Sequence, residues 1–119
     1  MKRLIRSFSH ASDGIKTAFS TQANFRIHTF MAVVVVVAGV VFRLDVTEWA
    51  IIIVCIGSVI GAECINTAIE AAVDLYTSEY NEKARIAKDC SAAGVLIVSI
   101  MSAVTGIIIF LSKLTDLVL

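Results

Sequence analysis

Three long apolar runs, separated by short polar stretches, dominate the pattern of the chain. A helix needs about 20 mostly apolar residues to cross the hydrocarbon core of a bilayer. The first run is slightly short and reaches this length when it is extended back to Asn24, whereas the second is purely apolar or small up to Ala62 and then becomes amphipathic. Within lipid the backbone must satisfy its own hydrogen bonds, which favours helices despite the many β-branched residues. The pattern predicts membrane-spanning helices at about 24–42, 49–75 and 92–111.

A different pattern precedes the first run. Residues 2–19 repeat apolar side chains at helical spacing, with charged side chains on the opposite face. The apolar positions include Leu4, Phe8, Ala11, Ile15 and Ala18. Because membrane spans rather than a soluble core follow, we expect this amphipathic helix to lie in the membrane interface, with its basic face toward the headgroups. The expected fold class is therefore an all-α membrane protein.

Composition and charge agree with this fold class. The 119 residues allow one domain, 58% of them are hydrophobic, and proline is absent. The mean hydropathy is +0.89, well above that of an ordinary soluble domain. The formal net charge is zero, which argues against a nucleic acid partner because phosphate binding needs a basic excess.

The distribution of basic residues predicts the orientation in the membrane. Five basic residues precede the first apolar run, which begins at about Ile27, and three more lie between the second and third predicted spans. The opposite side carries only Arg43 and Lys113. Because cytoplasmic segments are enriched in lysine and arginine, we expect the N-terminus and the loop between the second and third spans in the cytoplasm. A polar loop is expected at about residues 76–91.

Small and sulfur-containing residues in the spans indicate packing rather than chemistry. Gly57 and Gly61 form a Gly-x-x-x-Gly pair, which is typical of closely packed membrane helices. Cys55, Cys64 and Cys90 are too widely spaced for a metal site. We expect them to be buried, reduced thiols.

A row of polar side chains occupies the end of the second span. At about 100° per residue, the spacing of these residues places them on one face of a helix. They are Glu63, Asn66, Thr67, Glu70 and Asp74. Carboxylates inside a membrane span are costly, so a functional interpretation is the default. The alternative is a solvated helix end, which applies best to Asp74 and least to Glu63, the deepest member.

The types of residue in this row suit phosphate chemistry. A partly desolvated Glu63 suits a general base, and Glu70, nearer water, suits a hard cation such as Mg²⁺. Asn66 lies between them and could position a substrate oxygen. Lys88 and Asp89 face this end from the following segment, and lysine, carboxylates and a divalent cation together handle phosphate. A glycine-rich phosphate loop is absent from the sequence, so a nucleotide site would differ from the P-loop and protein-kinase types.

Long stretches of the sequence resemble the prokaryotic diacylglycerol kinase family, which includes the undecaprenol kinases. The resemblance rests on Glu63-Cys-Ile-Asn66-Thr67-Ala68-Ile69-Glu70-Ala-Ala-Val73-Asp74, on Ser78-Glu79-Tyr80-Asn81, and on Ala87-Lys88-Asp89 followed by Ser91-Ala92-Ala93-Gly94. The segment Asn24-Phe25-Arg26-Ile27-His28 is most similar to the undecaprenol kinase branch. The resemblance covers essentially the whole chain. It implies a homotrimeric bundle with active sites shared between subunits at the cytoplasmic interface.

The resemblance also implies roles for individual residues. Glu63 matches the catalytic base of the family, and Glu70 matches its principal metal ligand. Other positions match residues that line the active site, namely Asn66, Asp74 and Arg26. A further set matches nucleotide contacts, namely Arg3, His10, Gln22, Glu70, Glu79, Tyr80, Asn81, Lys88 and Asp89. Where the family usually has a second metal-binding glutamate, this sequence has Gln22, which leaves the second metal position open.

Three classes of function remain at this point. The first is a Mg²⁺-dependent kinase that transfers the γ-phosphoryl group of ATP to a membrane lipid alcohol, with undecaprenol favoured over diacylglycerol. The second is a small proton-coupled transporter in which Glu63 relays protons. The third is a non-catalytic membrane subunit. The Lys88–Asp89 pair and the acidic row favour the kinase, because a proton relay needs neither.

Overall fold

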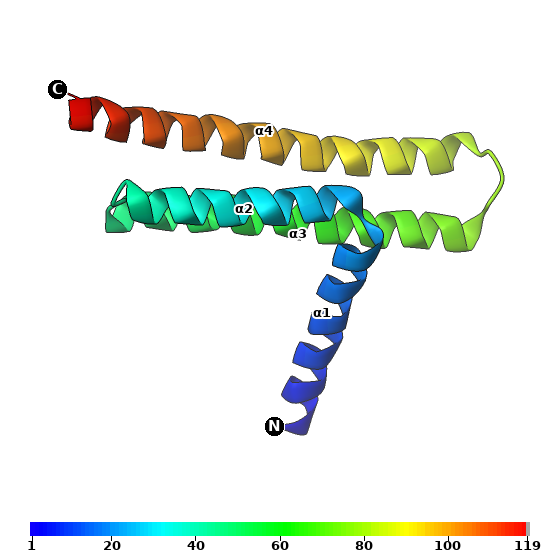
Figure 1. The fold of residues 1–119 in the computed structure, drawn as a ribbon. Coiled ribbons are helices and arrows are strands. Elements are labelled where there is room, and N and C mark those ends of the chain that lie inside the picture. The colour runs from blue at the N-terminus through cyan, green and yellow to red at the C-terminus, as the bar shows by residue number, and fades with distance from the viewer. Residues whose placement is uncertain (119) are drawn as a thin grey trace.

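Four helices make up the structure, which is a computed structural model that describes residues 1–118. They are α1 (Lys2–Thr21), α2 (Ala23–Val41), α3 (Val46–Tyr76) and α4 (Glu82–Val118). Figure 1 shows α2, α3 and α4 side by side with alternating directions, and α1 leaving the bundle at a steep angle. Helix α3 is central, because it contacts each of the other three helices.

Three helices are long and apolar enough to cross a membrane, by length and composition. These segments are Ala23–Val41, Val46–Tyr76 and Glu82–Asp116. At about 1.5 Å per residue, α3 and α4 are each well over 40 Å long, whereas the hydrocarbon core is about 30 Å thick. Both helices therefore extend beyond a bilayer core, and the polar row of α3 lies in its second half, toward the loop that leads to α4.

The connection between α3 and α4 is shorter than the sequence pattern suggests. The prediction of a polar loop over residues 76–91 was wrong for residues 82–91, which form the first turns of α4. Only residues 77–81 connect the two helices. The side chain of Asn81 explains the early start, because its Oδ1 accepts hydrogen bonds from the backbone N–H groups of Lys83 at 3.0 Å and Ala84 at 3.1 Å.

The turn between α2 and α3 is tight and ends α2 in a Schellman arrangement. Arg43 adopts a left-handed conformation with φ of 54°. Its N–H donates to Val40 O at 3.2 Å, and Leu44 N–H donates to Gly39 O at 3.0 Å. A Cβ added to Gly39 would lie 2.7 Å from Cη2 of Trp49, so only glycine leaves room for this indole. These contacts return the chain alongside α2 in the opposite direction.

The start of α3 is fixed by a capping box. Asp45 Oδ1 accepts from Glu48 N–H at 2.9 Å, and Glu48 Oε2 accepts from Asp45 N–H at 2.8 Å. Glu48 also forms an ion pair with Lys113 of α4 at 2.8 Å. A small apolar cluster of Leu44, Ile52 and Ile109 lies at this end of the bundle. These contacts stabilise the end of the bundle that carries the α2–α3 turn, which we call the hairpin end. The polar row lies at the opposite end of α3.

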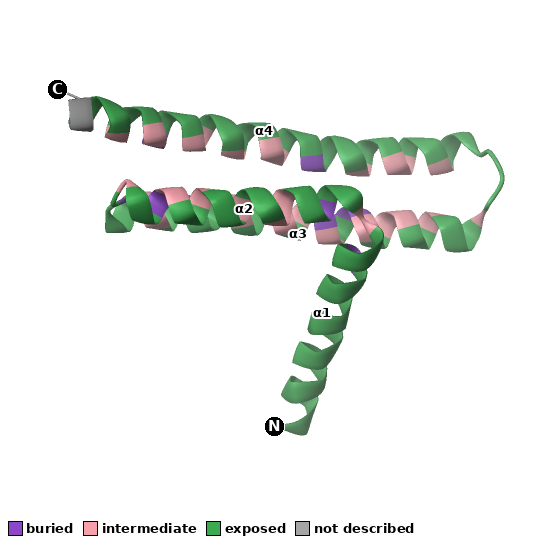
Figure 2. Cartoon of the chain, viewed as in Figure 1, coloured by how far each residue is buried: buried purple, intermediate pink, exposed green. Residues whose placement is uncertain are grey.

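Most of the apolar surface of the spans faces outward, as Figure 2 shows by the prevalence of exposed residues. This is the arrangement expected when lipid or another copy of the chain covers the helices. A Cβ at Gly57 or Gly61 would meet no atom within 4 Å among the described residues, so the predicted close packing is not made within one chain. All three cysteines are free, but the prediction that they are buried was wrong, because Cys55 and Cys64 are half-buried and Cys90 is exposed.

Candidate active site

Two polar side chains of the α3 row are buried. Glu63 is 2% exposed and Asn66 is 8% exposed, and in the described part of the chain these are the buried polar or charged side chains. They lie one turn apart on the face of α3 that turns toward α2 and α4. Burial of a carboxylate without compensation is costly, so the surroundings of Glu63 are the first point of interest.

The nearest polar side chain to Glu63 comes from α2. His28 Nε2 lies 3.2 Å from Glu63 Oε1, within the distance of an ion pair when the imidazole is protonated. The two groups do not meet in hydrogen-bond geometry, and Oε1 has no hydrogen-bond donor among the residues that the structure describes. Thr67 donates instead to the main-chain oxygen of Glu63 at 2.9 Å. One carboxylate oxygen therefore remains available to accept a proton.

Glu70 lies at the centre of a second group of contacts. Its Oε2 accepts from Gln22 Nε2 at 3.2 Å, and its Oε1 accepts from Asn66 Nδ2 at 3.3 Å. The hydroxyl of Ser91 on α4 donates to Asn66 Oδ1 at 2.7 Å. Glu70 thus accepts two amide hydrogen bonds and forms no ion pair within residues 1–118. Three segments of the chain, the α1–α2 junction, α3 and α4, contribute to this network.

The same residues line a cavity of about 360 Å³. Its lining residues are Gln22, Asn24, Ile27, His28, Glu63, Asn66, Glu70, Ala92, Val95, Leu96 and Ser99. The structure therefore brings together four of the residues that the sequence singled out, Gln22, Glu63, Asn66 and Glu70. These four come from two separate parts of the chain.

An apolar cavity of about 650 Å³ adjoins the polar one, and it runs between α2, α3 and α4. Both cavities are lined by Ile27, His28 and Ser99, so these residues mark their junction. The apolar cavity extends from this junction toward the hairpin end of the bundle, where Phe110 and Ile52 line it. A polar chamber that contains carboxylates thus continues into an apolar groove along the membrane spans.

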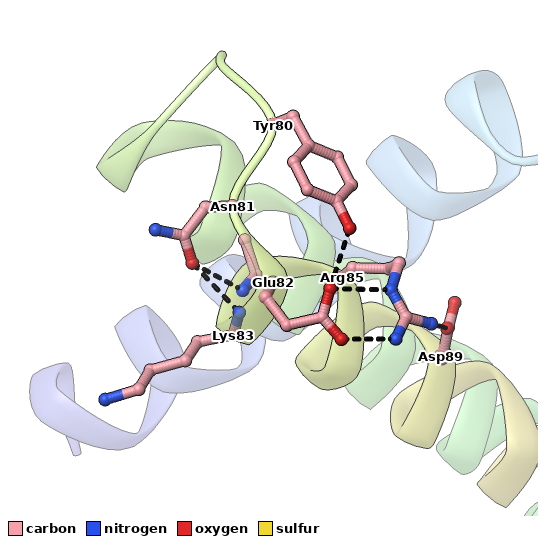
Figure 3. A network of polar contacts seen from close by, with 7 residues as sticks. Tyr80, Asn81, Glu82, Lys83, Arg85 and Asp89 are labelled. Atoms are coloured by element: carbon pink, nitrogen blue, oxygen red, sulfur yellow. Dashed lines mark hydrogen bonds and ion pairs between the residues drawn. The ribbon is translucent and has the colours of Figure 1, made fainter.

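A third group of polar contacts surrounds the start of α4 (Figure 3). Arg85 donates to Glu82 Oε1 at 2.6 Å and to Asp89 Oδ2 at 2.7 Å. Tyr80 donates through its hydroxyl to Glu82 Oε2 at 2.7 Å. All of these residues are exposed. Glu82, Arg85 and Asp89 lie on successive turns of α4, and Tyr80 reaches them from the loop before it. Tyr80, Asn81 and Asp89 thus occupy the same region, as the sequence motifs suggested, and Arg85 joins them.

Asp74 and Lys88 connect this region to the polar row. Lys88 Nζ forms an ion pair with Asp74 Oδ1 at 2.5 Å between the last turns of α3 and the first turns of α4. Both side chains are partly solvated, and Asp74 is one turn beyond Glu70. The polar row therefore continues from the buried Glu63 to a charged, solvated end.

The remaining sequence-derived residues lie outside the cavity. Arg26 donates through Nη1 to the carbonyl oxygens of Phe19 at 2.9 Å and Ser20 at 3.2 Å, so it caps the end of α1 rather than lining the chamber. Arg3 and His10 are exposed on α1, which projects away from the bundle in Figure 1. Glu79 is exposed in the α3–α4 loop. Within one chain, these side chains are not grouped with Glu63.

Comparison with known proteins decides the family. The sequence model of the prokaryotic diacylglycerol kinase family matches residues 9–110. The chain belongs to that family. The match includes every residue of the polar cavity, from Gln22 to Ser99.

Individual relatives of the family differ in the lipid that they are named for. The chain is 39% identical over 114 residues to the undecaprenol kinase of Bacillus subtilis (strain 168), covering 96% of this chain and 93% of that protein. It is 40% identical over 115 residues to a diacylglycerol kinase of a Synechocystis species, covering 96% of this chain and 66% of that protein. It is 32% identical over 110 residues to the diacylglycerol kinase of Escherichia coli (strain K12), covering 92% and 90%.

The donor set of this family member can be tested against a divalent cation. The described residues contain no group of three or more His, Cys, Asp or Glu side chains that could hold a metal. Mg²⁺, however, is usually bound by one or two carboxylates together with substrate phosphates and waters. Glu70 lines the chamber and, among the described residues, accepts hydrogen bonds at its carboxylate only from the amide nitrogens of Gln22 and Asn66, so this carboxylate fits a cation that is completed by a phosphate ligand.

Sequence reasoning missed several residues of this site. His28 and Ser99 carry the junction of the two cavities, Ser91 orients Asn66, and Arg85 organises the start of α4. His28 and Ser91 belong to segments that carry the family resemblance, and this was the available signal. Ser99 lies in an apolar run that also contains Ser102 and Thr105, and nothing in the sequence distinguishes it from them.

Proposed function

We propose that this member of the prokaryotic diacylglycerol kinase family phosphorylates a membrane lipid alcohol with ATP, and that the alcohol is undecaprenol. One observation carries the proposal. A chamber with a buried carboxylate continues directly into an apolar groove along the spans. Such a junction suits a substrate with one reactive polar group on a long apolar chain, because the polar group would lie in the polar chamber and the chain in the apolar groove.

Glu63 is the proposed general base. Glu63 lines the chamber, and its Oε1 accepts no hydrogen bond from the described residues, so the carboxylate could take the proton of a lipid hydroxyl there. The hydroxyl oxygen then forms a bond to the γ-phosphorus of ATP, the bond from that phosphorus to the β,γ-bridging oxygen breaks, and ADP leaves. The proton on Glu63 returns to water through the polar chamber. Burial supports this role because it excludes the water that would otherwise compete for the phosphoryl group.

The solvated end of the polar row is the proposed triphosphate region. Glu70, with Gln22 and Asn66, would hold Mg²⁺ there, and the bound cation would neutralise phosphate charge. Lys88 and Asp89 would contact the phosphates, together with the turn that carries Glu79, Tyr80 and Asn81. The position of Lys88 supports this assignment, because its ion pair with Asp74 continues the polar row from Glu70 toward the α3–α4 loop.

A homotrimer with shared active sites is part of the proposal. Arg3 and His10 project with α1 away from the chamber of their own chain, so nucleotide contacts from them would have to be made in another subunit. The unfilled surface at Gly57 and Gly61 supports packing against a second copy. Subunit mixing tests this directly. If sites are shared, inactive Glu63→Gln and Arg3→Ala chains regain part of the activity when they are co-assembled, whereas sites confined to one chain give no recovery.

The proposed placement in the membrane follows the basic residues. The N-terminus and the α3–α4 loop would be cytoplasmic, and α1 would lie as an amphipathic helix in the membrane interface, with residues 1–119 acting as a single lipid kinase domain. Exposed apolar side chains on α1, among them Leu4, Phe8 and Ile15, support contact with lipid. A single cysteine introduced in the α3–α4 loop should then be labelled by an impermeant reagent from the cytoplasmic side alone, in a Cys55→Ala, Cys64→Ala, Cys90→Ala background.

The test of the function is lipid-dependent phosphoryl transfer by purified protein in detergent micelles. Labelled ATP, Mg²⁺ and either undecaprenol or dioleoylglycerol are supplied, and labelled lipid is measured. We expect labelled undecaprenyl phosphate in excess over labelled phosphatidic acid. Preferential labelling of the glycerolipid would instead favour a diacylglycerol kinase.

Absence of labelled lipid would favour one of the other classes. A proton-coupled transporter would move protons across vesicle membranes without ATP consumption. The buried Glu63 beside His28 favours a transporter as the second candidate function, because carboxylate and histidine side chains also form proton relays. Proton flux that persists in vesicles without ATP would support it.

A further inference from the structure

We propose that Ser99 binds the hydroxyl oxygen of the lipid alcohol, at a position between α3 and α4 where Glu63 accepts the hydroxyl proton. This inference rests on the proposed function and specifies how the substrate is recognised. It assigns the binding of the substrate's one polar group to a serine in the third span. The occupant of the adjoining groove is then the hydrocarbon chain of the same molecule.

The first argument is the unsatisfied state of the Ser99 hydroxyl. A serine within a helix commonly donates to the carbonyl oxygen four residues earlier, as Thr105 does to Met101 at 2.9 Å. Ser99 makes no such bond, and its Oγ is buried without a hydrogen-bond partner among the described residues. Leaving a buried hydroxyl unpaired is unfavourable, and an alcohol oxygen would remove this penalty.

The second argument is the position of this serine. Ser99 lines both the polar chamber and the apolar groove, and Glu63 lines the same chamber from α3. The other buried side-chain oxygen that lacks a hydrogen bond among the described residues is Glu63 Oε1, which has His28 Nε2 at 3.2 Å. A hydroxyl placed between them would accept from Ser99 and donate to Glu63, which satisfies both groups with one substrate atom.

The third argument concerns the rest of the groove. Ser102 also lines it, but its hydroxyl donates to Cys55 O at 3.5 Å and is therefore engaged within the protein. The remaining lining is almost entirely aliphatic and aromatic. An alcohol whose remainder is hydrocarbon fits this groove, whereas the two ester groups of a diacylglycerol would lie next to the hydroxyl without a matching donor.

Binding measurements on the full-length protein in lipid nanodiscs test the inference separately from turnover. The probes are undecaprenol, its methyl ether and the corresponding hydrocarbon, and bound lipid is counted by native mass spectrometry. Ser99→Ala should weaken binding of the alcohol and of the ether by about 2- to 12-fold, the range for one neutral hydrogen bond. Binding of the hydrocarbon should not change, because it offers no oxygen to Ser99. Ser99→Thr retains the hydroxyl and should retain most of the affinity.

A matched control removes a hydroxyl elsewhere on the same helix. Thr105→Ala deletes a group that is engaged with its own helix and lines neither cavity, so binding of all three probes should stay at the wild-type level. In the kinase assay, Ser99→Ala should raise KM for undecaprenol and leave KM for ATP unchanged.

Two outcomes would overturn the inference. Equal affinity of wild type and Ser99→Ala for undecaprenol would show that Ser99 does not contact the hydroxyl. An equal loss for all three probes, or a change in the number of subunits in the same mass spectra, would show that Ser99 packs the helices together or that a second copy covers the groove. If wild type binds undecaprenol through Ser99 but transfers no phosphate, the inference holds and the proposed kinase function fails.

Discussion

The side-chain amide of Gln22 donates to Glu70 Oε2 at 3.2 Å, and this contact joins residues 48 positions apart in the chain. It links the α1–α2 junction to the second half of α3. Asn66 donates to the other oxygen of the same carboxylate at 3.3 Å. The two neutral amides orient this carboxylate without bringing an opposite charge beside it. Glu70 therefore has no charged partner among the described residues, which fits its proposed role as a cation ligand.

Replacing this carboxylate should weaken the response to Mg²⁺. Glu70→Ala removes the charged oxygen ligand of the chamber, and the Mg²⁺ concentration for half-maximal activity should rise by about 10- to 100-fold, a range typical when support of a metal site is lost. Titration of lipid phosphorylation with Mg²⁺ at saturating ATP measures this. Asp116→Ala removes a carboxylate near the other end of α4 and serves as the control. Overlapping titration curves for Glu70→Ala and wild type would exclude Glu70 as a ligand.

Loss of the buried carboxylate should abolish turnover without unfolding the protein. Glu63→Gln keeps size and polarity but removes the proton acceptor, and the expected loss in kcat is about 10²- to 10⁴-fold. Thermal unfolding in detergent and the oligomeric state should remain close to wild type. A folded Glu63→Gln protein with near-normal kcat would show that another group takes the proton.

His28 should matter for catalysis through its effect on Glu63. Its Nε2 lies 3.2 Å from Glu63 Oε1, and in the described residues it is the ion-pair partner of that carboxylate. His28→Ala should lower kcat by about 10- to 150-fold, the range for losing an interaction with a charged group, while KM for ATP stays constant. Added imidazole should restore part of the rate. Loss of rate without imidazole rescue, together with a lower unfolding temperature, would indicate a purely structural role.

The number and order of the helices follow from the sequence because long apolar runs in lipid leave little choice of backbone conformation. The helical start of α4 could not be read in the same way. Residues 82–91 are polar, and polarity alone does not separate a loop from a solvated helix. The cap at Asn81 and the contacts of Arg85 with residues on neighbouring turns stabilise a helix here. These contacts are visible only in the structure.

The candidate site was predictable along α3 but not across the helices. One helix face gathers Glu63, Asn66 and Glu70 by periodicity alone. The partners His28 and Ser99 come from α2 and α4, and their register against α3 depends on how the helices pack. Ser99 shows the limit most clearly, because the sequence does not distinguish it from Ser102 and Thr105 in the same run.

The turn between α2 and α3 should be sensitive to a single methyl group. A Cβ at Gly39 would lie 2.7 Å from Trp49 Cη2 and 3.1 Å from Leu44 Cδ1. Gly39→Ala should therefore destabilise the fold by about 1–3 kcal/mol, as overpacking does. Unfolding in mixed detergent and denaturant measures the change. Gly14→Ala is the control, because its Cβ would meet no atom within 4 Å in the described chain and alanine favours a helix. Equal stability of Gly39→Ala and wild type would mean that the indole moves freely.

The last prediction concerns Gln22, which stands where the family resemblance implies a glutamate. Gln22→Glu should tighten Mg²⁺ binding, because a carboxylate places a full charge beside the cation where the amide supplies only a dipole. The change also removes the amide donor to Glu70 and sets two carboxylates beside each other. Without Mg²⁺ this repulsion should lower the unfolding temperature below that of wild type, and added Mg²⁺ should raise it by more than it does for wild type. Mg²⁺ titrations of activity and of thermal unfolding provide two separate measurements.

Gln22→Ala distinguishes a ligand from a hydrogen-bond donor. If Gln22 supplies an oxygen to the cation, Gln22→Ala should need more Mg²⁺ than wild type, and Gln22→Glu should need less. If another carboxylate has taken over the position, the new charge in Gln22→Glu should raise the requirement instead. Asp89 is a poor substitute because Arg85 already holds its carboxylate at 2.7 Å, which leaves the exposed Glu79 of the loop as the alternative. Three superimposable titration curves would mean that Gln22 only orients Glu70 and that the cation is bound without it.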